Sequence, residues 1–332
     1  MTPNLEFKQK ALAYWTDEKL KKLSNGSQYH LTPQNAPALL RALGLLNADA
    51  SFSADSMRKY KQMNHLLNLL EKDFQELAKR FQPVHLWEVG CGKSYLSFVV
   101  AHYFKEVLKA PVRIFAFDAN PQLIQSAQRV VDMAGLGEEI RLSHQSLMAL
   151  TLKPDQWPQL VPEAFLEGST TPRVHGLMGL HACDTLSCAA LSLGLNLKAD
   201  LLAMVPCCQA QLASQLKSKT PGTLSLGWSS LKEHPELRRE MASQLTDLMR
   251  VQLLEGSGYE VVSTEFVSGF HSAKNRLIIG RRRAQFRDDA LIKYQDLSKS
   301  LGDSDIYLRH HLPDWVDRRM AQTPKLEGLV EA

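Results

Sequence analysis

The sequence contains no hydrophobic run long enough to cross a membrane, and only five cysteines occur among its 332 residues. A spanning helix needs roughly 18 consecutive apolar residues. Residues 1–8 have no apolar run after their charges, so we expect neither a membrane span nor a secretory signal. An odd number of cysteines, two of them adjacent at Cys207 and Cys208, indicates reduced thiols and a cytoplasmic protein.

Neither positive nor negative charge is in large excess. Lysine and arginine number 39 against 35 aspartates and glutamates, which gives a formal net charge of +4. This excess is too small to require a nucleic-acid partner and does not exclude one. With 44% hydrophobic and 22% charged residues, the chain has the composition of an ordinary globular protein. Disorder, collagen-like repeats and small disulfide scaffolds are therefore excluded.

The first 83 residues predict helices. Apolar residues among lysines and glutamates indicate helix over 5–23, and Thr32-Pro33 is a start signal for a helix over 38–46. A longer helix is expected after Ser53, with Pro83 ending it. Its apolar stripe has a spacing of three and four residues, which is typical of packing rather than cofactor binding: Tyr60, Met63, Leu67, Leu70, Phe74, Leu77 and Phe81.

From His85 short apolar runs alternate with amphipathic segments. We predict strands over 85–89, 113–118, 140–144, 174–181, 201–207, 259–267 and 274–281, with helices at about 93–108, 120–134, 155–166, 185–197 and 235–256. Such alternation predicts right-handed crossovers and a mostly parallel sheet. Only the loop 268–273 separates the last two strands, so these form an antiparallel hairpin at the sheet edge.

The predicted fold is therefore α/β and Rossmann-like, with a seven-stranded, mostly parallel sheet whose last strand is antiparallel. We expect three parts: a helical region over 1–83, a ligand-binding domain over 84–284 and a helical extension over 285–332.

A glycine-rich loop, Gly90-Cys91-Gly92-Lys93-Ser94, leads from the first strand into a helix, and three interpretations compete. A phosphate-binding loop would need its first glycine at Trp87, inside the strand. A dinucleotide fingerprint would need its last glycine at Tyr95. The remaining interpretation is a loop for S-adenosylmethionine (SAM), which has no phosphate and needs only a tight turn and close backbone approach.

Asp118 ends the second strand, 26 residues after Gly92. A carboxylate at this place can accept hydrogen bonds from both ribose hydroxyls of a nucleoside. The alternative is a cap for the helix that begins at Asn120-Pro121, but Asn120 itself suits that task. We favour the ligand interpretation.

Five segments together resemble a known family: 88–97 (EVGCGKSYLS), 179–185 (GLHACDT), 206–208 (PCC), 58–62 (RKYKQ) and 272–278 (SAKNRLI). They resemble the class I SAM-dependent methyltransferases related to methyltransferase-like protein 25, in particular its bacterial relatives. A more distant similarity is to the tRNA ribose 2′-O-methyltransferase that carries an H-x-C-G-x-x-T-D motif. The combination is far more specific than the glycine loop alone.

The resemblance covers about residues 55–283 and implies SAM as cofactor, with S-adenosylhomocysteine as its product. Two positions depart from the pattern: Gln209 stands where relatives often carry a histidine, and Gln145 or Ser146 must replace the usual acid beside adenine. The cofactor residues expected are Glu88, Gly90, Cys91, Gly92, Ser94, Asp118, Ala119, Gln145, Ser146 and His181.

Two polar residues of the fourth strand's end are the catalytic candidates. His181 titrates near neutrality and can act as a base, although a core histidine is an equal alternative. Asp184 can orient His181 or bind substrate, but its expected single role is to cap the following helix. With Cys183, Cys207 and Cys208, His181 offers ligands suited to zinc. No C-x-x-C spacing is present, and small thiols that shape the pocket floor are the preferred interpretation, with no metal.

The expected substrate residues are Lys274, Asn275, Cys207, Gln209 and Arg58. Lys274 can neutralise an anionic acceptor and Asn275 can hydrogen-bond to a base, unless it only closes the hairpin loop. Arg58 lies with Lys61 and His65 on one helix face that is solvated by default. The alternative is that this helix, which directly precedes the first strand, lies across the mouth of the pocket. Arg281-Arg282-Arg283 is expected at the far edge of the sheet.

The preferred hypothesis is a SAM-dependent methyltransferase that acts on an unidentified acceptor, with RNA of the tRNA kind favoured because the distant relatives act on tRNA. A protein or small-molecule acceptor stays open. The alternatives are a non-catalytic SAM-binding or interaction module, since fold does not guarantee function, and a nicotinamide-dependent oxidoreductase.

Overall fold

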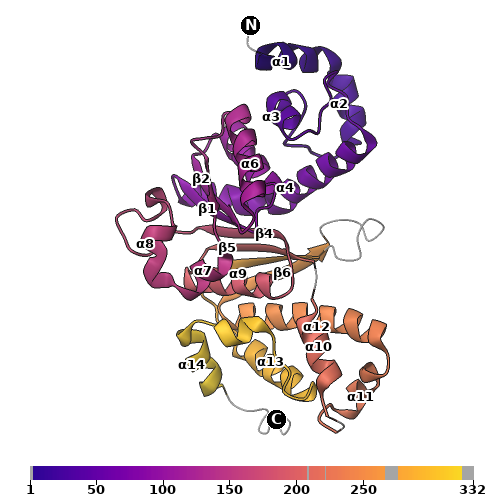
Figure 1. Cartoon of the computed structure of the whole chain (residues 1–332), viewed down its shortest axis with the longest axis vertical. Coiled ribbons are helices and arrows are strands. Elements are labelled where there is room, and N and C mark those ends of the chain that lie inside the picture. Colours follow the sequence, from indigo (N-terminus) through magenta and orange to yellow (C-terminus); the bar gives the residue numbers. More distant parts are fainter. Residues whose placement is uncertain (1–2, 208, 221, 266–275, 324–332) are drawn as a thin grey trace. The chain divides into compact units, whose positions relative to one another are not determined.

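The computed structural model describes residues 3–207, 209–220, 222–265 and 276–323. The chain forms two compact units (Figure 1). The first unit comprises Met1–Ser146 and Gln159–Phe165, and the second comprises Leu147–Pro158 and Leu166–Ala332. The predicted boundaries at residues 83 and 284 stay a prediction.

All seven predicted strands are present, and their order is β3-β2-β1-β4-β5-β7-β6. In the first unit β2 pairs in parallel with β1 and with β3. In the second unit β4 and β5 are parallel, whereas β7 runs antiparallel to both β5 and β6. The predicted Rossmann-like α/β fold is confirmed. The strands are β1 (Val84–Val89), β2 (Val112–Asp118), β3 (Ile140–His144), β4 (Gly176–Ala182), β5 (Leu201–Pro206), β6 (Tyr259–Glu265) and β7 (Arg276–Arg282).

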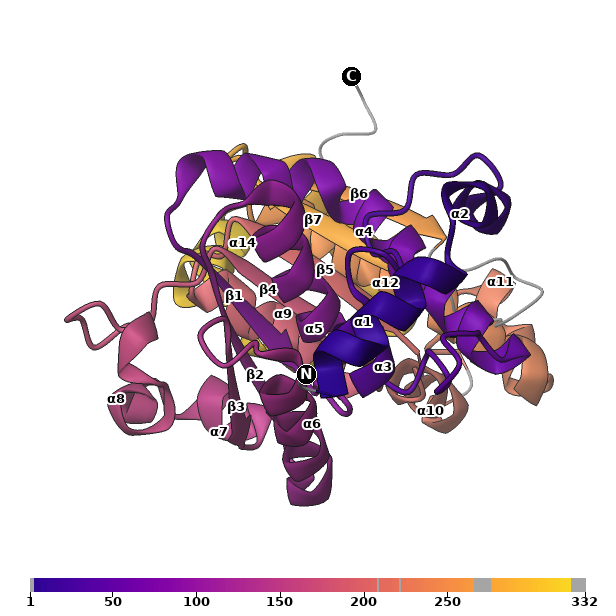
Figure 2. The ribbon, with the colours of Figure 1, turned by 90° about the horizontal axis from the view of Figure 1, so that it is seen from above.

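The first unit contains the predicted N-terminal helices (Figure 2). The single helix expected over 5–23 is divided in two, because Thr16 caps a second helix by accepting from the Lys19 amide. They are α1 (Pro3–Tyr14), α2 (Asp17–Ser24), α3 (Pro37–Ala42) and α4 (Ala54–Arg80), followed by α5 (Tyr95–His102) and α6 (Pro121–Ala134). A capping box between Ser53 and Ser56 starts α4, because each side chain satisfies a backbone amide of the other. The apolar stripe predicted for α4 is largely buried.

The helix predicted over 38–46 is shorter than expected. Its start at Pro37 is within one residue of the prediction, and the shortening is at its carboxyl end. The start signal at Thr32-Pro33 was wrong, because Thr32 and Asn35 exchange backbone-to-side-chain hydrogen bonds and close a separate turn. The helix ends at Ala42, two residues before Gly44, which has a φ of 68°. The α3 helix packs against α1 and α6.

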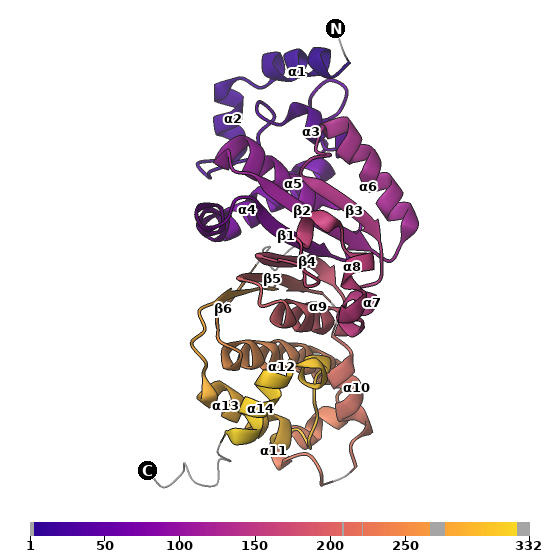
Figure 3. The same ribbon diagram turned by 90° about the vertical axis from the view of Figure 1, so that its left-hand side faces the viewer.

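The second unit contains helices α7 (Leu147–Leu152), α9 (Thr185–Asn196), α10 (Gln211–Ser218), α11 (Leu226–Ser229), α12 (Pro235–Gly256), α13 (Asp288–Ser300) and α14 (Asp314–Gln322). Helix α12 packs against α10, α13 and β6 (Figure 3). The α10 helix has no counterpart among the predicted elements.

The single helix predicted over 155–166 was wrong. Three short pieces occupy this stretch instead, a 3₁₀ turn at Pro154–Gln156, α8 (Trp157–Leu160) and a second 3₁₀ turn at Glu163–Phe165. Pro162 lies between the last two pieces. A proline has no amide hydrogen and clashes with the preceding turn, so it ends the helix.

No helix among the described residues is both long enough and apolar enough to span a bilayer. The predicted cytoplasmic location stays a prediction.

We expect Asn64→Ala to lower the free energy of unfolding by about 2 kcal/mol, since a buried amide hydrogen would lose its acceptor. Asn64 is fully buried, and its side chain accepts from the Leu31 amide at 2.9 Å and donates to the Leu31 carbonyl at 3.0 Å. Urea unfolding measures the loss. The control is Asn68→Ala on the same helix, which removes one bond to the Gln28 carbonyl. An equal loss in both variants would contradict the role of Asn64.

Candidate active site

The loop between β1 and α5 turns through left-handed backbone conformations. Gly90 and Gly92 have φ angles of 59° and 55°, and Ser94 follows with 57°. The Cys91 amide donates to the Phe117 carbonyl at 3.0 Å, which ties the loop to the end of β2. A Cβ atom at Gly92 would meet no described atom within 4 Å. Glycine is therefore required there by its backbone, and the space beside it is open to a ligand.

Glu88 lies beneath this loop and is only 2% exposed. Its Oε2 atom accepts hydrogen bonds from the Ser97 amide at 3.0 Å, from the Ser94 hydroxyl at 3.2 Å and from the Ser97 hydroxyl. The carboxyl thus satisfies an amide in the first turn of α5, where the Ser94 side chain makes no capping bond. Burial raises the pKa of Glu88 to about 7, against the lowering effect of these hydrogen bonds.

Asp118 connects the ends of β1 and β2. Its Oδ2 atom accepts from the Gly92 amide at 2.9 Å and its Oδ1 atom accepts from the Asn120 amide at 2.8 Å. Asn120 caps α6 by accepting from the Gln122 and Leu123 amides. The prediction that Asn120 caps this helix is confirmed, and the half-buried Asp118 carboxylate lies directly beside the glycine loop.

The residues after β3 extend the same edge of the first unit. The Gln145 amide donates to the Asp118 carbonyl at 3.0 Å, and its side-chain nitrogen donates to the Leu160 carbonyl. Its Oε1 atom is buried and has no hydrogen-bond partner among the described residues. Ser146 and Ala119 are exposed. An open glycine loop, a carboxylate and a spare amide acceptor together offer the donors and acceptors that a nucleoside requires.

In the second unit Asp184 stands at the N-cap position of α9, with φ of 46° and ψ of −114°. It makes no capping bond, so the predicted capping role was wrong. An N-cap residue needs an extended backbone, which Asp184 lacks. Its Oδ1 atom instead accepts from the amides of Ala210 and Gln211, at 3.1 and 3.2 Å. The carboxylate therefore joins the loop after β4 to the loop after β5.

The thiols of Cys183 and Cys207 are 3.1 Å apart, also across these two loops. Cys183 is exposed and Cys207 is half-buried. None of the four described cysteines is in a disulfide. Within the described part of the chain, no three His, Cys, Asp or Glu side chains form a metal-binding group. Cys208 lies outside the described residues.

Gln209 is half-buried and belongs to a network, buried at Asp247 and Arg250, that the sequence did not reveal. Its Nε2 atom donates to Oδ1 of Asp247 at 2.6 Å, and its Oε1 atom accepts from the Ser243 hydroxyl. Arg250 forms an ion pair with Asp247 at 3.0 Å. Burial raises the pKa of Asp247, while Arg250 and Gln209 act against the rise. The available signal was an acid and a base three residues apart on the apolar face of α12.

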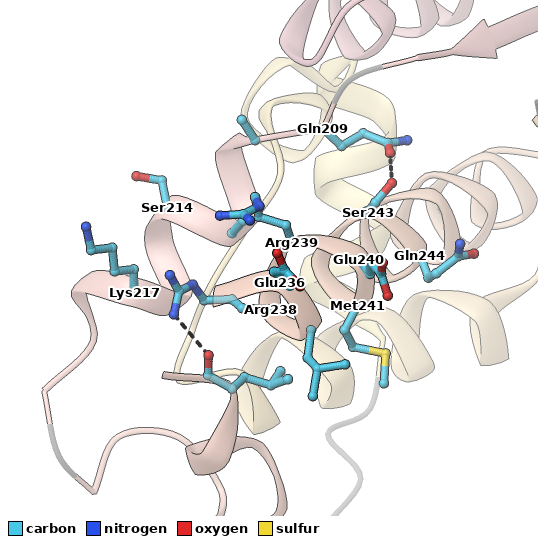
Figure 4. A pocket seen from close by; sticks show the side chains of 14 residues that line it. Gln209, Ser214, Lys217, Glu236, Arg238, Arg239, Glu240, Met241, Ser243 and Gln244 are labelled. Atoms are coloured by element: carbon cyan, nitrogen blue, oxygen red, sulfur yellow. Dashed lines mark hydrogen bonds between the residues drawn. The ribbon is translucent and has the colours of Figure 1, made fainter. Parts of the chain in front are cut away.

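Gln209 also lines a pocket of about 1170 Å³, which lies between α10, the turn before α12 and α12 itself (Figure 4). Its lining mixes apolar side chains with charges of both signs. The charged residues are Lys217, Arg238, Arg239, Glu236 and Glu240. Gln209 is thus shared between the pocket and the buried network.

The remaining predicted residues have these positions. Arg58 is exposed on α4 and forms an ion pair with Asp55. His181 lies in β4 where the register with β5 shifts, and its side chain is outside the described atoms. Lys274 and Asn275 lie outside the described residues. Arg281 pairs with Leu201, at the amino end of β5, as predicted.

We expect the free energy of unfolding to fall by about 2 kcal/mol between pH 5 and pH 8 because of Glu88. Its folded-state pKa of about 7 lies above the unfolded value of about 4.3. The protonated carboxyl therefore stabilises the fold at low pH, and this stabilisation is lost as the pH rises through about 7. Chemical unfolding at both pH values measures the difference.

Glu88→Gln should abolish this part of the pH dependence, because its amide stays neutral. The exposed Glu240→Gln is the control and should behave as wild type. A Glu88→Gln profile that overlays wild type would contradict the assignment.

Residues 58–215 match a family model described as a methyltransferase domain. Three solved structures are similar to this chain. A methyltransferase of Podospora anserina with bound S-adenosylhomocysteine is 10% identical with a TM-score of 0.39, and the match covers 81% of this chain and 97% of that chain. The METTL16 methyltransferase domain (13% identity, TM-score 0.40, coverage 75% and 77%) and magnesium protoporphyrin IX methyltransferase of Synechocystis (14% identity, TM-score 0.38, coverage 80% and 100%) are the other two.

No curated protein sequence matches the chain. The family match and the strand order agree with each other: this chain carries the fold and domain of a class I SAM-dependent methyltransferase.

Proposed function

We propose that this enzyme transfers the methyl group of SAM to RNA, with tRNA as the favoured acceptor. The observation that carries the cofactor assignment is the hydrogen bond between the Gly92 amide and the Asp118 carboxylate. It joins the loop that approaches a nucleoside with the acid that recognises a ribose.

In this proposal SAM lies along the edge formed by β1, β2 and β3. The space beside Gly92 accommodates the cofactor, and Asp118 accepts the ribose hydroxyls. The unpartnered Oε1 atom of Gln145 accepts from the adenine amino group, replacing the acid that relatives carry. Glu88 and Ser94 act from beneath by holding the loop, and Ala119 and Ser146 line the exposed rim.

Bound SAM supplies an electrophilic methyl group on a sulfonium. The chain's own contribution is to place the acceptor in line with that methyl group and to exclude water, which accounts for most of the rate acceleration in such displacements. We assign His181 as the base for a protonated acceptor. Because the Asp184 carboxylate already accepts two backbone amides, its proposed role is to order the loop that carries Gln209.

The acceptor proposal rests on the likeness to a tRNA methyltransferase and on charge. The chain carries four more basic than acidic residues. Three basic side chains, Lys217, Arg238 and Arg239, line the same pocket as Gln209, against two acidic ones, Glu236 and Glu240. Lys274, Asn275 and Cys207 complete the proposed acceptor side. Cationic side chains of this kind position a nucleic-acid backbone through phosphate contacts.

Asp118→Asn should weaken S-adenosylhomocysteine binding by tenfold or more, because a charged hydrogen bond contributes about 1.5–3 kcal/mol. The asparagine keeps one oxygen for the Gly92 amide. Isothermal titration calorimetry measures the affinity, with Asp132→Asn on the exposed face of α6 as the matched control. Unchanged affinity in the Asp118 variant would remove this residue from the cofactor site.

The acceptor class is tested with methyl-labelled SAM and a lysate of cells that lack this gene. We expect label to enter the tRNA-sized fraction and nuclease, not protease, to release it. Release by protease would replace RNA with a protein acceptor. Binding of S-adenosylhomocysteine without any transfer would instead identify a non-catalytic SAM-binding module.

A further inference from the structure

Arg250 is a buried cation in the middle of α12, with a side chain that is 1% exposed. Each of its three guanidinium nitrogens has a partner. Nη2 donates to the Asp184 carbonyl at 2.8 Å, Nη1 to Oδ1 of Asp247 at 3.0 Å and Nε to the Cys188 sulfur at 3.3 Å. The planar guanidinium is the side chain best suited to three fixed directions at once.

These contacts close a ring of hydrogen bonds within the second unit. Arg250 holds the backbone of Asp184, whose carboxylate accepts from the Ala210 and Gln211 amides. The neighbouring Gln209 donates to Asp247, and Asp247 pairs again with Arg250. The ring therefore links the loop after β4, the loop after β5 and one turn of α12.

Stability alone does not explain this ring. Burying an ion pair carries a desolvation cost, and apolar residues of similar volume often stabilise a fold as well or better. Asp184 adds a second cost, because its φ of 46° with ψ of −114° is a strained conformation for a residue other than glycine. Such strain persists only where surrounding contacts over-determine it, and it concentrates at functional sites.

We propose that Arg250 is a positioning residue, which holds the loops after β4 and β5 in one relative arrangement for methyl transfer. This inference rests on the proposed function, since the loop after β5 carries Cys207 and Gln209 of the proposed acceptor side. Arg250 acts through Asp184 and Asp247 and does not itself contact the reacting atoms. The loop after β4, which contains Asp184, directly follows the strand that carries His181, the assigned base.

The test compares Arg250→Lys with wild type. Lysine keeps the charge but cannot reach three partners. We expect kcat for label transfer to tRNA-sized RNA to fall at least tenfold, since small misplacements of reacting groups are costly. The KM for SAM should stay within twofold. Hydrogen exchange at the Ala210 and Gln211 amides, followed by NMR, should accelerate at least tenfold because their acceptor is no longer held.

The matched control is Tyr259→Phe, which removes a buried hydrogen bond to the Ala199 carbonyl at 2.7 Å, before the amino end of β5. It should lower the melting temperature without changing kcat or the exchange of these two amides. If Arg250→Lys does not fold by circular dichroism, Asp247→Asn takes its place with the same expected split.

Unchanged kcat, or unchanged exchange at Ala210 and Gln211, would overturn the positioning role. If the wild-type protein transfers no label to RNA, the proposal of an RNA acceptor is rejected. The hydrogen-exchange measurement alone then tests the positioning role of Arg250. Faster exchange in the variant would still support Arg250 as the residue that orders the two loops, and wild-type exchange would reject it.

Discussion

The hydrogen bond from the Gly92 amide to the Asp118 carboxylate is the contact on which the proposed cofactor edge depends. It forms because β1 and β2 pair in parallel with Val89 opposite Phe117, so both strands end at the same level. The Cys91 amide then reaches the Phe117 carbonyl and fixes the turn. A shift of register by one residue would move the carboxylate away from the loop and transfer each side chain of β2 to the opposite face of the sheet.

Two buried acids order their surroundings in different ways. Glu88 has only hydroxyl and amide donors, and burial therefore raises its pKa to about 7. Burial also raises the pKa of Asp247, but the Arg250 guanidinium and the Gln209 side-chain amide lower it. Glu88 organises the start of α5 beneath the glycine loop, whereas Asp247 organises a ring that joins two loops and α12. Glu88 orders the backbone directly by accepting from the Ser97 amide, whereas Asp247 acts through the side chains of Gln209 and Arg250. Such satisfied buried networks hold groups in fixed positions.

Local patterns predicted much of this molecule. Alternating strands and helices predicted the seven-stranded sheet and its antiparallel last strand. Asn120 followed by proline predicted the start of α6. The errors arose where another interaction prevailed over the local signal. Thr32 bonds to Asn35 in a turn instead of starting a helix, and a proline interrupts the helix expected over 155–166. Asp184 accepts from the loop after β5 instead of capping α9.

The sequence by itself determined the fold class, the glycine loop and the identity of the acid beside it, because these depend on periodicity and on spacing within one strand–helix–strand unit. Only the tertiary structure decided that Asp184 bonds to Ala210 and that Arg250 holds Asp184 from 66 residues away. Such contacts have no local signature. Their partners meet only after the sheet and α12 have formed, and burial then makes each hydrogen bond strong and each unmet one costly.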